Sequence, residues 1–265
     1  MNAAADQPAD RPADQRSPKD TFITVYGRKP VLEALSDPTL TVDKVIAADN
    51  ARGDSLSKIL SAARGRNVPV RRASAHRVKV LAGNGHHDQG VLADVVAPEM
   101  RPVADYLDAL DPQAPCALFV LDAVTNPANV GMVLRTATAA GLDGVLVPRR
   151  GVPAIDPLVI KASAGVAFRA PVLRASTAAD GCAALRAAGV TVLGLAGDAP
   201  RDLLSDELPP RLALVLGNET DGLSADVRAH LDGTVAIPMH AGVESLNVAC
   251  AAAVAAYRLR HPVSG

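Results

Sequence analysis

From residue 116 onward the chain alternates short apolar runs with helix-like segments, and this alternation limits the choice of fold more than any other feature. Residues 116–124 are almost continuously apolar, as expected of a strand buried on both faces. Helical periodicity follows at 128–140 and ends before Gly141. Repeated strand–helix units of this kind predict an α/β domain whose parallel sheet is covered by helices on both faces. Further strands are expected at 144–147, 190–196, 212–216 and 234–237, and further helices at 157–164, 179–188 and 247–260.

Residues 21–98 carry a second, shorter set of alternating segments. Strands are expected at 21–25, 42–48, 68–72 and 91–96, and helices at 30–35 and 55–64. Four prolines follow between residues 97 and 115, which is typical of a linker, here with one short helix at 103–110. We therefore expect a small α/β domain at 21–98, a linker at 99–115 and the larger α/β domain at 116–265.

The first twenty residues contain four Asp and almost no side chain that could enter a core, so residues 1–20 are predicted to be a disordered tail. They lack the apolar centre of a secretion signal, and their acidic residues argue against a mitochondrial presequence. No apolar run in the chain approaches the roughly 18 residues that a membrane span requires. We expect a cytoplasmic protein without a membrane segment.

The three cysteines lie far apart and form no Cys-x-x-Cys pair, so we expect buried thiols in a reducing compartment and no metal site. Aromatic residues make up only 2% of the chain. This predicts a core of Ala, Val and Leu, and it argues against an aromatic platform on which bases would stack. Any contact with nucleic acid would then depend on charge.

Positive charge is concentrated in the N-terminal part, although the net charge of the chain is only −1. Residues 21–98 hold eleven Lys or Arg against seven Asp or Glu, whereas residues 99–265 hold thirteen against seventeen. The segment 58–79 contains seven basic residues and no acidic one. Such clustering is typical of a phosphate-binding surface, and the alternative is an ordinary solvated helix and loop.

The glycine-bearing loops of the larger domain do not match the common nucleotide-binding fingerprints. No Gly-x-Gly-x-x-Gly follows the strand at 116–124 and no Gly-x4-Gly-Lys-Ser/Thr segment occurs, which disfavours a Rossmann dehydrogenase and a P-loop NTPase. Glycines cluster instead after the strand at 212–216, and a second loop follows the strand at 234–237. Because parallel sheets bind ligands at the carboxyl ends of their strands, these two loops are expected to form a ligand crevice.

Three segments of this domain resemble, in order and in spacing, the three motifs of the SpoU/TrmH class of RNA 2′-O-ribose methyltransferases in the SPOUT superfamily. The segment Asn129-x-Gly131-x3-Arg135 resembles motif 1. Residues 214–224 (Leu-Val-Leu-Gly-Asn-Glu-x-x-Gly-Leu-Ser) resemble motif 2, and residues 237–249 (Ile-Pro-Met-x5-Ser-Leu-Asn-Val-Ala) resemble motif 3. The resemblance extends from about residue 116 to residue 257.

The N-terminal domain resembles the RNA substrate-binding domain that is often joined to this class, through the segment Tyr26-Gly27-Arg28 and the pair Gln89-Gly90. In the family this domain folds like certain RNA-binding ribosomal proteins. Where the family usually has His before Gln-Gly, this chain has Asp88, with His86 and His87 upstream. Contacts to the RNA backbone are expected from Arg28, Arg64, Arg66, Arg71 and Arg72.

The resemblance implies transfer of a methyl group from S-adenosylmethionine to a ribose 2′-hydroxyl of RNA. The N-terminal domain favours 23S rRNA as the substrate, because members that act on tRNA typically carry different appendages. The resemblance also implies a trefoil knot in the C-terminal segment and a homodimer with the active site at or near the subunit interface. The expected partners are therefore RNA and a second copy of the chain.

Individual side chains also receive roles from the resemblance. Arg135 is central to catalysis in the family; because a guanidinium resists deprotonation, we expect a cation that binds the 3′-phosphate and lowers the pKa of the 2′-hydroxyl. Asn129 is expected to orient the loop or the ribose, and Glu219 to hold Asn129 or Arg135 in place. S-adenosylmethionine is expected to contact Leu216, Gly217, Asn218, Gly222, Ile237, Pro238, Met239, Ser245, Leu246 and Asn247.

Other polar residues near the motifs have simpler interpretations. At least one of Ser245 and Asn247 is expected to cap the last helix. Glu244 is interpreted as an acid in the first turn of that helix, where the helix dipole favours it. Turn or cap positions are expected for Asp122, Asp221, Asp226 and Asp232.

Three alternatives stay open. An enzyme of the same fold would act on tRNA. A non-catalytic RNA-binding or ribosome-assembly protein would retain the fold, but it would not need Asn129, Arg135, Glu219, Ser245 and Asn247 together. A Rossmann oxidoreductase would bind NAD(H), and the sequence lacks its fingerprint.

Overall fold

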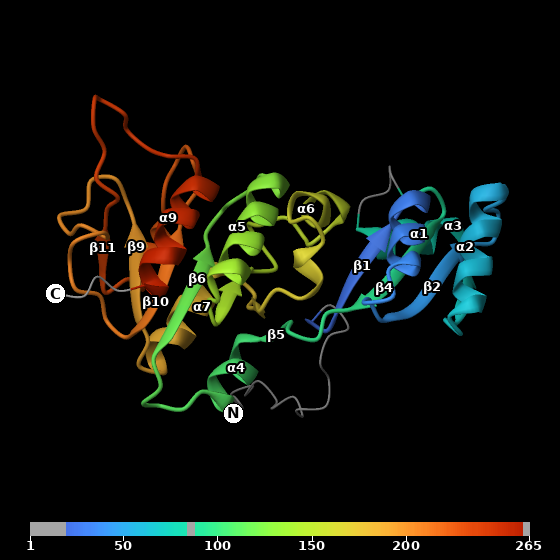
Figure 1. Cartoon of the computed structure of the whole chain (residues 1–265), viewed down its shortest axis with the longest axis horizontal. Helices are drawn as coiled ribbons and strands as arrows, with labels where there is room; N and C mark the ends of the chain where they lie inside the picture. The colour runs from blue at the N-terminus through green and yellow to red at the C-terminus, as the bar shows by residue number, and fades with distance from the viewer. Residues whose placement is uncertain (1–19, 84–87, 262–265) are drawn as a thin grey trace, which may run out of the picture.

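The chain folds into two α/β units, one built on a four-stranded sheet and one on a seven-stranded sheet (Figure 1). The computed structural model describes residues 20–83 and 88–261. The predicted tail, apart from Asp20, lies outside the described residues, as do His86 and His87. Figure 1 has the N-terminal unit at one end of the molecule and the C-terminal unit at the other.

The N-terminal unit is the small α/β domain that the sequence predicts. Its strands lie in the order β1–β4–β2–β3, with β4 antiparallel to both β1 and β2, and β3 parallel to β2. The strands are β1 (Phe22–Tyr26), β2 (Val42–Ala48), β3 (Val70–Ala73) and β4 (Val91–Val96), and the helices are α1 (Arg28–Ser36), α2 (Asp54–Gly65) and α3 (Ala75–Ala82). Helix α3 was not expected from the sequence, because its eight residues begin inside the basic segment 58–79 and carry no strong periodicity.

The seven-stranded sheet is entirely parallel, as the alternation of strands and helices predicts. Its order is β11–β9–β10–β6–β7–β8–β5. The strands are β5 (Arg101–Pro102), β6 (Cys116–Leu121), β7 (Gly144–Leu146), β8 (Val172–Arg174), β9 (Thr191–Leu195), β10 (Arg211–Leu216) and β11 (Gly233–Val235). The central strand β6 is buried along its whole length, which confirms the interpretation of its apolar run.

Helices cover both faces of this sheet, and each face has its own hydrophobic cluster. Helices α5 (Pro127–Ala140), α6 (Pro157–Ala162) and α9 (Val248–Arg260) cover one face, where the cluster continues into the N-terminal unit. Helices α4 (Val103–Ala109), α7 (Ala178–Ala187) and α8 (Ala225–Arg228) cover the other face. The predicted double-sided cover is confirmed.

The segment 99–115, predicted to be a linker, contributes structure to the larger unit. Its first residues form β5, which pairs with β8 at the edge of the sheet. The helix that follows, α4, buries Val103 and Tyr106 in the cluster it shares with α7.

The two units contact each other at the start of α6. The Tyr26 hydroxyl of β1 donates to Asp156 Oδ2 at 3.3 Å, and Asp156 Oδ1 caps α6 by accepting from the backbone N–H groups of residues 158 and 159. Burial, reinforced by the nearby Asp156 carboxylate, raises the pKa of Tyr26 to about 12. Asp20 and Arg149 form an ion pair across the same boundary. The start of α6 and the loop after β7 are therefore two places where the C-terminal unit contacts the N-terminal unit.

The motif 1 glycine, Gly131, makes room for α6. A Cβ atom at this position would lie 2.5 Å from the Val159 carbonyl oxygen, 2.6 Å from the Ala162 Cβ and 2.9 Å from the Ser163 nitrogen. Two of these atoms are backbone and cannot move without shifting α6. Gly131 is thus a packing residue that fixes how α5 and α6 cross.

We expect Gly131→Ala to lower the free energy of unfolding by about 1–3 kcal/mol, because the added methyl overpacks the α5–α6 contact. Urea denaturation followed by circular dichroism measures the loss. Gly65→Ala is the matched control: no atom lies within 4 Å of its Cβ position at the end of α2, so stability should be unchanged or slightly higher. If the two variants are equally stable, α5 and α6 do not pack as closely at Gly131 as the structure has them.

Within residues 20–83 and 88–261, no helix is long and apolar enough to cross a bilayer. The same residues contain no cluster of three side chains that could hold a metal ion. The trefoil knot stays a prediction.

Candidate active site

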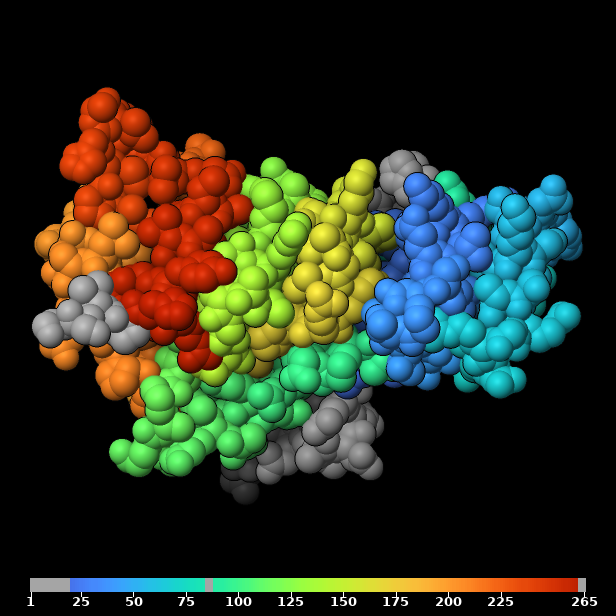
Figure 2. Space-filling model, in the orientation of Figure 1, coloured from blue at the N-terminus to red at the C-terminus, as the bar shows by residue number. Residues whose placement is uncertain are grey.

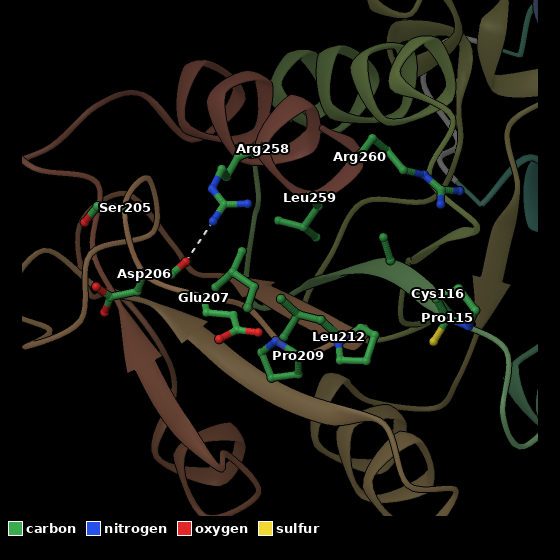
Figure 3. Close-up of a pocket in the computed structure, with 13 residues that line it drawn as sticks. Pro115, Cys116, Ser205, Asp206, Glu207, Pro209, Leu212, Arg258, Leu259 and Arg260 are labelled. Carbon is green, nitrogen blue, oxygen red and sulfur yellow. Dashed lines mark hydrogen bonds between the residues drawn. The ribbon is translucent and has the colours of Figure 1, made fainter. Parts of the chain in front are cut away.

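Two cavities lie at opposite edges of the large sheet. The larger, about 680 Å³, lies at the amino edge, where β6 and β10 begin and α9 ends (Figure 3). Arg258 points into it and donates to the Leu204 and Asp206 carbonyls at 3.1 and 2.7 Å. This amino-edge cavity contains no residue of motif 1, and parallel sheets bind their ligands at the opposite edge. We therefore look for the active site at the carboxyl edge.

The second cavity, about 400 Å³, lies at the carboxyl ends of β9, β10 and β11. We call it the carboxyl-edge pocket, and its volume is in the range of ligand sites. Eight of the ten residues predicted to contact the cofactor line it: Leu216, Gly217, Asn218, Gly222, Ile237, Met239, Ser245 and Leu246. Pro238 and Asn247 do not line it.

The loop after β9 also lines the carboxyl-edge pocket, and the sequence did not predict this. Gly197 and Asp198 face the motif 2 and motif 3 loops across it. The reason is the strand order, since β9 lies between β10 and β11. The end of the apolar run at 190–196 was the available signal, but chain order alone does not reveal which strands are neighbours.

The lining of the carboxyl-edge pocket is acidic. It includes four carboxylates and one guanidinium: Asp198, Glu219, Asp221, Glu244 and Arg228. The interpretation of Glu244 as a first-turn acid was wrong, because α9 begins only at Val248 and Glu244 lies in the loop before it. The pocket thus favours a ligand with positive charge.

Two glycines let the motif 2 loop fold back on itself. The backbones of Asn218 and Gly222 pair through N–H···O bonds of 2.9 and 3.0 Å. A Cβ at Gly217 would lie 2.6 Å from the carbonyl carbon and oxygen of Gly222, and Gly222 itself has a φ of +68°. Only glycine allows this approach, because the Gly222 backbone occupies the place of a side chain at Gly217.

Polar side chains tie the motif 2 loop to the end of β6. The Asn218 amide donates to the Ala123 carbonyl at 2.9 Å and accepts from the Thr220 N–H at 2.8 Å. Asp122, which is 5% exposed, accepts from the backbone N–H and the hydroxyl of Ser224 at 2.7 and 3.1 Å. Asn218 and Asp122 therefore hold the loop in place.

One side chain from each motif meets beside the pocket. Asn129, 3% exposed, donates through Nδ2 to Glu219 Oε1. Its Oδ1 accepts from Asn247 Nδ2 at 3.2 Å. Asn247 also caps α9 by accepting from the Ala249 N–H at 2.9 Å, which confirms that one of the two predicted residues caps this helix. We call Asn129, Glu219 and Asn247 the three-residue network.

Arg135 lies outside this network. At 100° per residue it is turned by about 120° around α5 from Asn129 and lies about 9 Å further along the axis. It is exposed, it does not line the carboxyl-edge pocket, and it makes no hydrogen bond or ion pair with any described residue. The guanidinium is therefore free to bind a group from outside the chain.

The predicted RNA-contacting arginines divide into two groups. Arg66 donates to four backbone carbonyls at and beyond the end of α1, at distances from 2.5 to 3.3 Å, so we reassign it to a structural role. Arg28 likewise donates to the Gln89 and Arg52 carbonyls and holds two turns together. Arg64 and Arg71 have exposed side chains that make no hydrogen bond within the described residues, whereas Arg72 is exposed but also donates to the Ala48 carbonyl at 3.0 Å.

Comparison with known proteins adds to this geometry. The model of the SpoU rRNA Methylase family matches residues 117–257, and the model described as RNA 2′-O ribose methyltransferase substrate binding matches residues 24–101. Over 231 residues the chain is 34% identical to the 23S rRNA (guanosine-2′-O-)-methyltransferase RlmB of Xanthomonas axonopodis pv. citri, an alignment that covers 87% of this chain and 92% of the relative. The protein of the same name from Xylella fastidiosa (strain 9a5c) is 35% identical over 233 residues, with the same coverage.

The fold has solved counterparts. An AdoMet-bound rRNA methyltransferase from Sinorhizobium meliloti superposes with a TM-score of 0.61 at 21% identity. The superposition covers 92% of this chain and 89% of that one. The likeness of fold therefore extends over most of this chain.

Proposed function

Because this chain belongs to the SpoU rRNA methylase family, we propose that it transfers a methyl group from S-adenosylmethionine to a ribose 2′-hydroxyl of 23S rRNA. The observation that carries the proposal is the three-residue network, which joins all three motifs beside the carboxyl-edge pocket. The relatives named as 23S rRNA methyltransferases support the choice of RNA, and they match the N-terminal unit as well as the catalytic one.

The carboxyl-edge pocket suits S-adenosylmethionine in size and charge. Its volume of about 400 Å³ is in the range of ligand sites, and the four lining carboxylates favour a cofactor that carries a cationic sulfur. They would repel the phosphates of NAD(H), which disfavours the oxidoreductase alternative. When bound, S-adenosylmethionine supplies an electrophilic methyl group. We propose that it contacts Leu216, Gly217, Asn218, Gly222, Ile237, Met239, Ser245 and Leu246.

The side chains around the pocket would then position the RNA. Arg135 binds the 3′-phosphate and lowers the pKa of the attacking 2′-hydroxyl, whose proton leaves to water. Asn129 orients the target ribose. Glu219 and Asn247 hold the Asn129 amide in one orientation, because each bonds a different end of it.

The N-terminal unit would bind the RNA backbone. Arg64, Arg71 and Arg72 are exposed and form no ion pair with a carboxylate in the described chain. Phosphate contacts of this kind fix the register of the RNA without reading its sequence. The proposed substrate would be met in the cytoplasm.

We further propose a homodimer that uses the outer surfaces of α5 and α9. Three apolar side chains are exposed on these two packed helices: Met132 at 39%, Val254 at 37% and Tyr257 at 50%. A second copy would remove them from water. Light scattering should give twice the chain mass of 27.2 kDa, and Tyr257→Asp should lower it.

The proposed activity is tested by supplying S-adenosylmethionine with a radiolabelled methyl group together with unmodified 23S rRNA, 16S rRNA or tRNA. Label in 23S rRNA that alkali releases as a resistant dinucleotide is the expected result, since only 2′-O-methylation blocks that cleavage. Label in tRNA alone would favour the tRNA alternative. No label in any RNA, with no calorimetric binding of S-adenosylmethionine, would leave a non-catalytic RNA-binding protein.

A further inference from the structure

The two helix-covered faces of the catalytic sheet differ in charge. Helices α5, α6 and α9 on one face contain four basic residues and no acidic one: Arg135, Lys161, Arg258 and Arg260. Helices α4, α7 and α8 on the other face contain both signs, with four acidic residues against two arginines. The asymmetry stands out in a segment, 99–265, that has more acidic than basic residues.

Only two of the four cations on the basic face are free. Arg258 is bonded to carbonyls at the amino-edge cavity, and Arg260 donates to Asp143 at 2.9 Å. Lys161, like Arg135, is exposed and makes no hydrogen bond or ion pair with any described residue. Two unpaired cations with no carboxylate on their helices favour an anion from outside the chain.

Arg135 and Lys161 lie on the two sides of one helix crossing. Gly131 marks the place where α5 contacts α6, and Arg135 follows it by one turn on the same side of α5. Lys161 directly precedes Ala162, whose Cβ lies at that crossing. Each of the two helices that meet at this crossing therefore carries one exposed cation.

The crossing of α5 and α6 lies between the N-terminal unit and the active site. Helix α6 begins directly after its N-cap Asp156, which the Tyr26 hydroxyl contacts, and it packs on the helix that carries Asn129. Figures 1 and 2 show α6 between α5 and the N-terminal unit, with its surface exposed in the same view. RNA held by the N-terminal unit would cross α6 to reach the three-residue network.

We propose that the exposed surface of α5 and α6 at this crossing is a track for the phosphate backbone of the substrate RNA, and that Lys161 is a positioning residue that binds a phosphate next to the one bound by Arg135. The inference rests on the proposed function, and it adds a contact outside both the N-terminal basic segment and the cofactor pocket. Lys161 acts on RNA binding, whereas Arg135 acts on the reacting ribose.

Lys161→Ala tests the track through RNA affinity and its salt dependence. We expect KM and Kd for 23S rRNA to rise about five- to tenfold at moderate salt, with kcat within about twofold of wild type. The slope of log Kd against log salt should fall by about 0.7–0.9, the value for one lost phosphate contact. Lys161→Arg should restore the wild-type RNA affinity and the wild-type salt slope. Affinity for S-adenosylmethionine should not change in either variant.

Arg186→Ala is the control for a lost positive charge on the other face, where Arg186 of α7 is paired with Asp232. Its RNA affinity and salt slope should equal those of wild type. The track is wrong if Lys161→Ala keeps the wild-type Kd and salt slope while the wild-type chain methylates RNA. It is equally wrong if kcat falls with Kd unchanged. Absence of methylation by the wild-type chain would instead count against the proposed function, while the binding curves would still test Lys161.

Discussion

Replacing Arg135 with alanine is expected to lower kcat for methyl transfer by about 10²- to 10³-fold, as is typical when one electrostatic contact is removed from a transition state. The guanidinium has no partner among the described residues, so it is available for the phosphate contact proposed above. Affinity for S-adenosylmethionine should stay unchanged, because Arg135 does not line the carboxyl-edge pocket. Single-turnover methyl transfer and calorimetric titration measure these two quantities.

Arg135→Lys separates charge from geometry. The ammonium keeps the positive charge but not the planar fork that binds a phosphate through two parallel bonds, so we expect only part of the rate to return. Folding should be unaffected in either variant, since the side chain is exposed. A kcat for Arg135→Ala within a few-fold of wild type would exclude Arg135 from the chemistry.

The grouping of the site could be predicted from the sequence because each motif follows a parallel strand. Motif 1 follows β6, motif 2 follows β10 and motif 3 follows β11, so all three reach the same edge of the sheet. Asn129 and Asn247 meet although 118 positions separate them. Strands β2 and β4 were predicted at their observed bounds, because polar residues on both sides of an apolar run mark the ends of the strand.

The strand order could not be predicted, and with it the loop after β9 was missed. Adjacency in a sheet depends on long-range packing, which a local pattern does not contain. Strands β5 and β8 were missed for another reason: with two and three residues they are too short to produce a period. The short helix α8, four residues long, was missed in the same way.

The role of Arg66 was also beyond the sequence. In a run of seven basic residues, a guanidinium that binds phosphate and one that binds backbone carbonyls look the same. The helix α1 ends without a side chain of its own to satisfy its last carbonyls, and Arg66 reaches them from α2. Charge clustering therefore predicts a surface, but not which of its members are free.

The largest effect within the buried part of the site is expected for Asn129→Asp. The substitution keeps the shape of the side chain but replaces its N–H donor with a carboxylate oxygen that faces Glu219. Two carboxylates would then share a position that is 3% exposed on the Asn129 side, where like charges repel strongly. We expect kcat to fall by at least about 10²-fold, and the free energy of unfolding to fall by about 1–3 kcal/mol.

A reciprocal exchange tests whether the loss comes from this contact. In the double variant Asn129→Asp with Glu219→Gln, the new amide donates to the new carboxylate, and the net charge equals that of wild type. The free energy of unfolding should therefore recover most of its loss, as measured by urea denaturation. Glu219→Gln alone is the control, because its carbonyl still accepts from Asn129 and stability should change little. If the double variant is no more stable than the sum of the two single effects allows, the hydrogen bond between Asn129 and Glu219 does not organise the site, and their shared orientation must depend on Asn247 and the motif 2 loop alone.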